Sequence, residues 1–205
     1  MQTPTTVDFW FDPSCPYTWI TSRWLVTVAR TRPITVHWHV MSLSVLNEDR
    51  EDDPEDDPDG WLWAPVRVCA AAEQRYGPAA LDRLFTAMGT LFHQRDEWDP
   101  TQALVEAGLP VDLAEAAEST EYDAAVRASH AAGIALVGDD VGTPLIALTR
   151  PDGSRSAFFG PVISACPQGA AAVRLWDGLL LLSSAPGVVE LKRSIDAAPD
   201  FTGLG

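Results

Sequence analysis

Two short apolar stretches flank an amphipathic one at the start of the chain. Residues 7–11 are almost entirely apolar or aromatic, which predicts a strand, and residues 34–41 alternate between apolar and polar as a second strand. Between them, the apolar positions of residues 19–28 recur near the helical period. We therefore expect a β-α-β unit here, with parallel strands joined by a right-handed crossover.

The rest of the pattern predicts a helical block, a hairpin and a last helix. Helices are expected over residues 65–76, 79–92, 101–107, 112–117 and 121–136. Residues 144–149 and 157–159 predict a hairpin around Pro151-Asp152-Gly153, followed by a helix at 168–182 and a short one at 188–195. This order indicates an α/β protein, with a small mixed sheet and a helical block inserted in its middle.

Composition narrows the class of protein. Hydrophobic residues make up 46% of the chain, which is enough for a core without metal or disulfide support. The net charge of -15 disfavours nucleic acid and anionic membranes as partners. We find no signal peptide and no stretch long enough to span a membrane. Three scattered cysteines, an odd number, favour a reduced cytoplasmic setting.

Much of the negative charge lies in one run, residues 48–59, between the second strand and the helical block. Such a run is typical of a solvated loop. A role for it as a lid over a site is left open by the sequence.

The candidate chemistry surrounds Cys15. This residue follows the first strand through Asp12, Pro13 and Ser14, and the next residue, Pro16, is favoured in the first turn of a helix. We expect the helix to begin at Cys15, with Ser14 as its cap. A thiol at a helix N-terminus faces unpaired backbone N–H groups that stabilise the thiolate, so the pKa of Cys15 is expected well below about 7.

A second loop, residues 141–144, precedes the hairpin and falls at the same edge of the sheet as Cys15. This loop and the segment from Phe9 to Trp19, FWFDPSCPYTW, resemble the DsbA-like branch of the thioredoxin superfamily. The closer resemblance is to the actinobacterial mycothiol-dependent nitroreductase family. Further similar segments are residues 39–43, 47–48, 60–74, 86–89, 107–110, 129–130, 138–144, 158–161 and 190–193.

The resemblance implies a DsbA-like thioredoxin fold, in which β-α-β and β-β-α units surround the sheet and an all-helical block is inserted. It implies a thioredoxin-like domain of residues 1–59 and 137–205 and a helical insertion domain of residues 60–136. It also makes the Thr143-Pro144 peptide bond cis.

The motif departs from the family at one position, since Cys-Pro-Trp-Cys is usual there and this chain has Cys15-Pro16-Tyr17-Thr18. A mixed disulfide on Cys15 must then be released by a second external thiol, which the resemblance implies is mycothiol. Cys15 is expected to be the nucleophile, and the Thr18 hydroxyl can donate to its thiolate. Substrate or thiol contacts are expected from Pro13, Ser14, Pro16, Tyr17, Gly142, Thr143, Pro144 and His39.

Three functions remain open from the sequence. The first is an oxidoreductase that uses mycothiol or another small thiol as cosubstrate, with no tightly bound cofactor, to reduce a small molecule or mixed disulfide. The second is an enzyme like the kappa-class glutathione transferases and chromene-carboxylate isomerases, which carry Ser-Pro-Tyr-Ser-like motifs and bind a thiol without redox turnover. The third is a thiol-binding module without catalysis. A homodimer is compatible with each.

The other candidate groups predict no site of their own. Cys69 lies in a helical run and Cys166 precedes Pro167, so both thiols are expected to be inert. The histidines lack the spacing of zinc ligands, and no metal is expected. His39 and His130 fall in segments that resemble the family, so each is either a pocket residue or a structural histidine.

Overall fold

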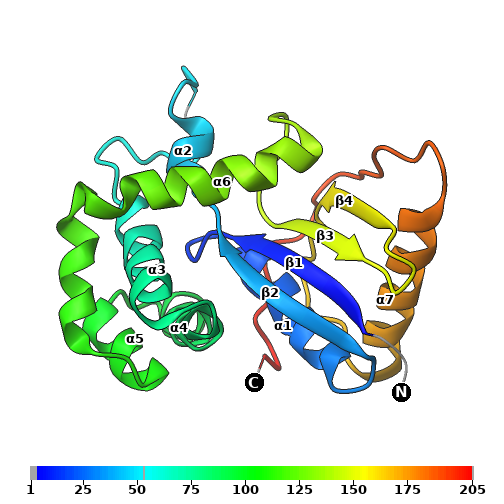
Figure 1. The fold of residues 1–205 in the computed structure, drawn as a ribbon, viewed down its shortest axis with the longest axis horizontal. Helices are drawn as coiled ribbons and strands as arrows, with labels where there is room; N and C mark the ends of the chain where they lie inside the picture. The colour runs from blue at the N-terminus through cyan, green and yellow to red at the C-terminus, as the bar shows by residue number, and fades with distance from the viewer. Residues whose placement is uncertain (1–3, 53, 205) are drawn as a thin grey trace.

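The computed structural model, which describes residues 4–52 and 54–204, is built on one mixed four-stranded sheet (Figure 1). The strands are β1 (Thr5–Phe11), β2 (Ile34–Val40), β3 (Leu145–Thr149) and β4 (Arg155–Phe159), in the spatial order β2-β1-β3-β4. β1 pairs in parallel with β2 and antiparallel with β3, and β3 forms the hairpin with β4. The predicted β-α-β unit and hairpin are both confirmed.

The alternation of side chains along β1 explains how the sheet is covered. Val7, Phe9 and Phe11 are fully buried on one face, against α1 (Pro16–Ala29) and the helical segments. Trp10 points to the other face, where its Nε1 donates to the carbonyl of Ser129 at 3.1 Å. Ser129 lies on α6 (Asp123–Val137), so this long helix covers the second face (Figure 1).

The last helix, α7 (Gly169–Ser184), packs beside α1. Trp24 of α1 and Trp176 of α7 are both buried, with ring centroids 6.2 Å apart. The Trp24 Nε1 group donates to the carbonyl of Ala172 at 2.9 Å, which satisfies the one polar group of a large apolar side chain. The helix predicted at residues 168–182 is therefore confirmed, and it closes the core beneath the sheet.

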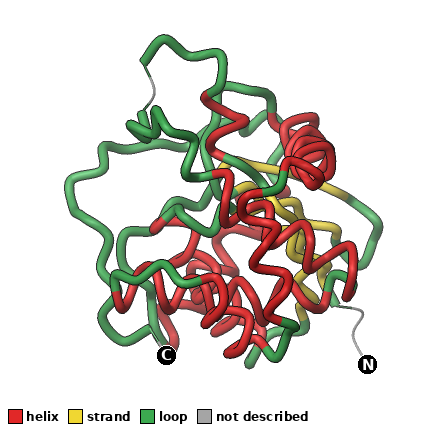
Figure 2. Tube along the Cα trace, turned by 90° about the vertical axis from the view of Figure 1, so that its left-hand side faces the viewer, coloured by secondary structure: helices red, strands yellow, loops and turns green. Residues whose placement is uncertain are grey.

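The helical segments between β2 and β3 stand in front of the sheet in the side view (Figure 2). They comprise α2 (Leu43–Asn47), α3 (Trp63–Tyr76), α4 (Ala79–Thr90), a π-helical turn η1 (Leu91–Arg95), α5 (Pro100–Ala107), the 3₁₀-helices η2 (Val111–Glu118) and η3 (Thr120–Tyr122), and α6. Phe85 of α4 stacks on Phe11 of the sheet at 4.0 Å. Gly89, one turn later, lies so close to Trp19 of α1 that a Cβ would overlap the indole ring. The helical segments thus share one core with the sheet.

Three local predictions are corrected. Residues 188–195 do not form a helix, because this segment has no partner on which to bury an apolar face: Val189 is 87% exposed and Leu191 is 82% exposed. The helix expected at 112–117 is a 3₁₀-helix, η2, and the one expected at 79–92 changes to the π-turn η1 at Leu91. The short α2 was not predicted; Ser42 caps it by accepting from the Val45 N–H.

The described residues of the acidic run, 48–52 and 54–59, belong to the loop that projects beside α2 (Figure 1). Two of its carboxylates are fixed. Glu48 forms two hydrogen bonds of 2.7 Å with Arg127 of α6, and Asp57 accepts from the N–H groups of Trp61 and Leu62, just before α3. The described residues of the loop are nearly all exposed, as expected of a solvated loop, and the loop is in addition anchored at both ends.

None of the helices in the described part of the chain combines the length and apolar character needed to cross a membrane.

Candidate active site

Cys15 lies where β1 passes into α1. It is the N-cap residue, and the helix proper begins at Pro16. The expected cap, Ser14, instead donates its hydroxyl to the Asp12 carboxylate at 2.6 Å, so the predicted helix start is corrected by one residue. Cys15 is 8% exposed and packs against Leu43 and Leu62, with Tyr17 beside it.

The second predicted loop does meet the first. The Thr143-Pro144 peptide bond is cis, as expected. The Cys15 thiol donates to the Thr143 carbonyl at 3.7 Å, and the hydroxyls of Thr18 and Thr143 lie 3.0 Å apart. Both hydroxyl-bearing side chains are buried. The two loops come together because the end of β1 and the start of β3 are paired neighbours, Trp10 opposite Leu145.

The ionisation of Cys15 contradicts the sequence-based expectation of a low pKa. Burial raises the pKa of the Cys15 thiol to about 11. Hydrogen bonds from the Thr18 hydroxyl and from the backbone N–H groups of Thr18 and Tyr17 act in the opposite direction, as a helix N-terminus should. Desolvation outweighs these donors, since Cys15 is buried in an apolar cluster with Leu43 and Leu62. In the closed site Cys15 is therefore a neutral thiol near pH 7.

Alkylation of Cys15 by iodoacetamide is accordingly expected to be slow at pH 7 and to rise about tenfold per pH unit up to at least pH 9. A thiol with a pKa of about 11 is ionised to only about one part in ten thousand at pH 7. Peptide mass spectrometry would follow the reaction, with the fully buried Cys69 as an unmodified internal reference. An alkylation rate that levels off near pH 7 would contradict this prediction and would show that the pKa of Cys15 is low after all.

A family model described as "Rv2466c-like: Mycothiol-dependent nitroreductase Rv2466c" matches residues 14–193 of this chain. The chain belongs to this family. The match covers both loops of the site. The chain is also 34% identical over 197 residues to Uncharacterized protein Rv2286c of Mycobacterium tuberculosis, covering 92% of this chain and 82% of that protein.

Solved structures agree with the fold of this nitroreductase-family protein. The cytosolic disulfide reductase DsbM of Pseudomonas aeruginosa matches with a TM-score of 0.54 and 20% identity, over 86% of this chain and 99% of that one. The DsbA of Chlamydia trachomatis matches with a TM-score of 0.53 and 11% identity, over 89% and 90% of the two chains. The nitroreductase-family chain thus has the DsbA-like thioredoxin fold, and the family supports a thiol-dependent oxidoreductase.

Asp12 is a residue of this nitroreductase-family site that the sequence analysis did not single out. Its carboxylate is fully buried and accepts from the Leu43 N–H at 2.8 Å and from the Ser14 N–H at 2.9 Å. Burial raises its pKa to about 6, against the effect of these hydrogen bonds. Its charge also acts on Cys15 by raising the pKa of that thiol. Asp12 therefore ties the Cys15 loop to the segment that covers it.

His93 also lies at the site of this nitroreductase-family chain, although sequence spacing gave no sign of it. It is on the π-turn η1, an irregularity often found at functional sites. Its Nε2 lies 3.0 Å from the carbonyl of Pro13, and since a carbonyl only accepts, Nε2 carries the proton. Burial lowers the pKa of His93 to about 4, so it is neutral at pH 7. Phe201, near the C-terminus, stacks on it at 5.6 Å.

Two predicted contact residues lie differently from the rest. His39 bonds Asp8 at 3.1 Å and stacks on Trp10, on the α6 face of the sheet. The substrate contact of His39 stays a prediction. Gly142 lies beside the Phe159 ring, and a Cβ atom at position 142 would lie only 3.3 Å from that ring.

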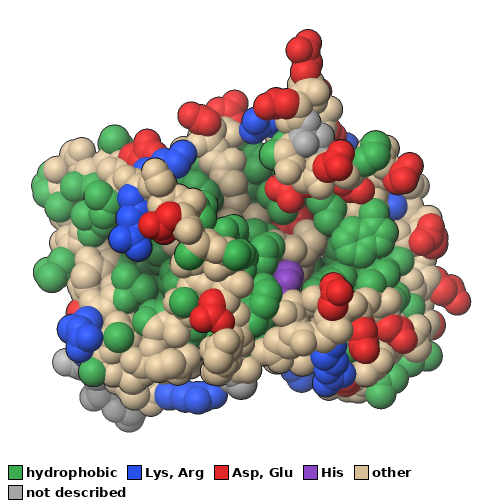
Figure 3. Space-filling model, turned by 180° about the vertical axis from the view of Figure 1, so that it is seen from behind, with side chains coloured by type: hydrophobic (Ala, Val, Ile, Leu, Met, Phe, Trp, Pro, Cys, Tyr) green, Lys and Arg blue, Asp and Glu red, His purple; other side chains and the backbone are tan. Residues whose placement is uncertain are grey.

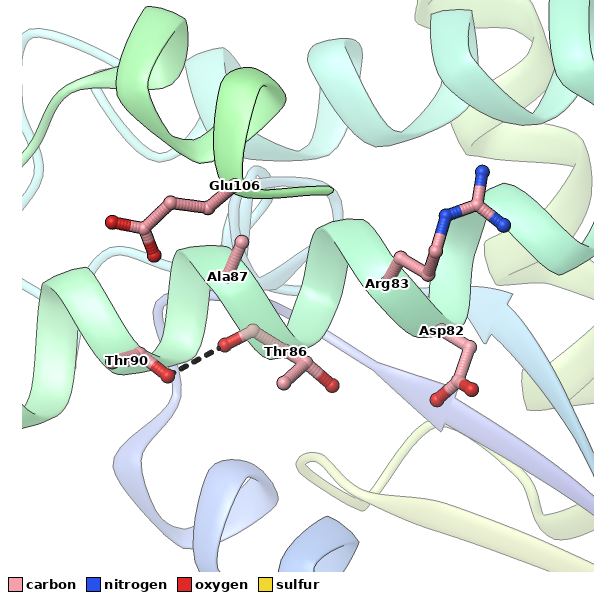
Figure 4. A pocket seen from close by; sticks show the side chains of 6 residues that line it. All are labelled: Asp82, Arg83, Thr86, Ala87, Thr90 and Glu106. Atoms are coloured by element: carbon pink, nitrogen blue, oxygen red, sulfur yellow. Dashed lines mark hydrogen bonds between the residues drawn. The ribbon is translucent and has the colours of Figure 1, made fainter. Parts of the chain in front are cut away.

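Two cavities adjoin the helical segments of this nitroreductase-family protein. One, of about 280 Å³, is walled partly by Leu43 and Leu62, the residues that cover Cys15. The other, of about 300 Å³, lies between α4 and α5 and is lined by six residues (Figure 4). In Figure 4 the Thr90 hydroxyl bonds the Thr86 carbonyl, and the lining has neither thiol nor imidazole. The first cavity is therefore the one that adjoins the apolar cluster around Cys15.

The remaining thiols lie outside the two loops. All three cysteines are free. Cys69 is packed on Met88 in the core, where burial raises its pKa well above the usual value, and Cys166 is half-buried before Pro167. Within residues 4–52 and 54–204, no three His, Cys, Asp or Glu side chains are grouped so as to hold a metal ion.

Proposed function

We propose that the protein is a mycothiol-dependent reductase that works by a monothiol mechanism in the cytoplasm, with Cys15 as nucleophile. The observation that carries the proposal is the pairing of Cys15 with the cis-proline loop, with Thr18 at the position of the second cysteine. Membership of the mycothiol-dependent nitroreductase family supports the choice of thiol.

The reaction has two exchange steps. The Cys15 thiolate attacks the mycothiol sulfur of a mixed disulfide, which forms a Cys15–mycothiol disulfide and releases the substrate as a thiolate. A second mycothiol thiolate then attacks the mycothiol sulfur on the enzyme, which releases mycothiol disulfide and restores the Cys15 thiolate. Each turnover thus consumes one free mycothiol thiol, which leaves as mycothiol disulfide together with the mycothiol that was bonded to the substrate. The released substrate thiolate takes up a proton from solvent.

The protein's own groups stabilise the thiolate in this sequence. The hydroxyl of Thr18 and the N–H groups of Tyr17 and Thr18 donate to the sulfur once it is ionised. Because the closed site holds a neutral thiol, Leu43 and Leu62 must move aside before attack, which also lowers the desolvation that opposes ionisation. Asp12, whose carboxyl is mostly ionised at pH 7, is our candidate for the group that takes the thiol proton.

Intact-mass spectrometry tests the proposal. With limiting mycothiol disulfide, the wild-type protein is expected to accumulate one mycothiol adduct, which peptide mapping places on Cys15, and added mycothiol should remove it. Cys15→Ser should form no adduct and lose all turnover while keeping its fold. A trapped disulfide from Cys15 to Cys69 or Cys166 would contradict the monothiol mechanism.

The raised pKa of Cys15 favours one alternative, an enzyme that binds a thiol and never forms a mixed disulfide, as a kappa-class transferase or isomerase would. In that case mycothiol should bind to both wild type and Cys15→Ser, and no adduct should form.

A further inference from the structure

The cavity beside Cys15 opens between α2, the acidic loop and the start of α3. Its wall includes Leu43 and Leu62, and the same two side chains form one buried apolar cluster with Cys15. This space of about 280 Å³ therefore adjoins the cluster that buries Cys15, and a small molecule attached to Cys15 can extend into it once the two leucines move aside.

One wall of the cavity carries a polar group without a partner. Asn47, the last residue of α2, lines the cavity and is only 7% exposed. Its Nδ2 has no hydrogen-bond acceptor within the described part of the chain. A buried amide donor without a partner is costly, and a ligand with hydroxyl or carbonyl oxygens would satisfy it.

The charged residues around the cavity are mostly acidic. Glu48, Glu55 and Asp57 line it, against a single lining cation, Arg50. Arg50 lies 3.5 Å from Asp52, which offsets its charge, and the charge of Glu48 is likewise offset by its two hydrogen bonds with Arg127. The charge of Glu55 also acts on the buried Asp12. Burial is the main cause that raises the pKa of Asp12, and the negative charge of Glu55 raises it further. In the space-filling view, acidic side chains of the projecting loop stand above a hollow lined with hydrophobic groups (Figure 3).

We propose that this cavity holds the part of the thiol or disulfide that is bonded to Cys15, and that its acidic rim selects neutral or cationic ligands over anionic ones. The inference rests on the proposed role of Cys15. Mycothiol, a polyhydroxylated thiol without a carboxylate, meets this requirement. Glutathione, with two carboxylates and one ammonium group, is repelled. The rim thus discriminates between thiols by like-charge repulsion as well as by fit.

A series of small disulfides that differ in charge tests the selection. The series comprises cystamine, which is cationic, hydroxyethyl disulfide, which is neutral, and 3,3'-dithiodipropionate, which is anionic. Rates of adduct formation at Cys15 are followed by intact mass, and each is divided by the rate of the same disulfide with free 2-mercaptoethanol. We expect the corrected rate for cystamine to exceed that for dithiodipropionate by about tenfold at low salt, and the ratio to fall at high salt.

Glu55→Gln is expected to reduce this ratio about threefold, because it removes one charge close to the cavity. The matched control is Glu115→Gln with Glu118→Gln, two exposed residues on η2 that line neither the cavity nor the loops. A ratio near one in wild type, or an equal loss in the control, would overturn the selection while the proposed function stands.

If no disulfide reacts with Cys15, the proposed function fails. The cavity is then judged on binding alone, by NMR titration of Cys15→Ser with the same compounds. Tighter binding of cystamine than of dithiodipropionate, with the difference lost in the double variant Cys15→Ser, Glu55→Gln, would support charge selection by the rim. Equal binding of the two compounds would refute it.

Discussion

Thr18→Cys is expected to convert the protein into a dithiol enzyme. The Thr18 hydroxyl is within hydrogen-bonding reach of the Cys15 sulfur, so a sulfur at the same position can form a disulfide with it. Mild oxidation should give an intramolecular disulfide between Cys15 and the introduced thiol, and insulin reduction should rise at least about tenfold above wild type. Mycothiol adducts on Cys15 should no longer accumulate, since the second thiol releases them.

Thr21→Cys provides the matched control for Thr18→Cys. Thr21 is buried on the same helix, one turn further from Cys15, and its hydroxyl donates to the Pro161 carbonyl. A thiol there should form no disulfide with Cys15. If Thr18→Cys behaves like this control, the two positions do not face each other and the placement of the site is wrong.

Gly89→Ala is expected to destabilise the protein by about 3 kcal/mol or more, since its Cβ would overlap the Trp19 indole. Trp19 cannot move freely, because it is buried and packs edge-on against Phe85. In a chain of this length that change corresponds to a fall in Tm of roughly 6–12 °C, measurable by calorimetry.

Gly178→Ala in α7 is the control, because its new Cβ would meet nothing within 4 Å. It should leave the stability unchanged or increase it by up to about 1 kcal/mol, as alanine favours a helix more than glycine does. Equal stability of the two variants would show that α1 and α4 can separate at little cost.

The sequence predicted the parts of the fold that repeat a strong pattern. Residues 7–11 are almost entirely apolar and residues 34–41 alternate, and both segments are strands in the structure. The meeting of the Cys15 and Pro144 loops could also be predicted, because the order of elements places the end of the first strand next to the start of the third. The family resemblance supplied what the pattern could not, the cis bond before Pro144.

What sequence could not supply depends on burial by distant segments. The pKa of Cys15 was predicted from its helix terminus alone, while Leu43 and Leu62, which desolvate it, lie far along the chain. His93 reaches Pro13 only through the π-turn η1, and no periodicity signals such a turn. The unpredicted α2 is short and depends on its Ser42 cap, a signal too common to be specific.

The central place of β1 also bears on how the protein is made. Its parallel partner β2 follows almost at once, whereas its antiparallel partner β3 begins only at Leu145. At roughly 5–20 residues per second, one edge of β1 stays unpaired for roughly 7–27 seconds before the start of β3 is synthesised. During that interval α4 emerges, and its Phe85 can already pack on Phe11. The nascent chain therefore carries an open apolar edge, and chaperones that shield strands are expected to act on it until β3 has left the ribosome.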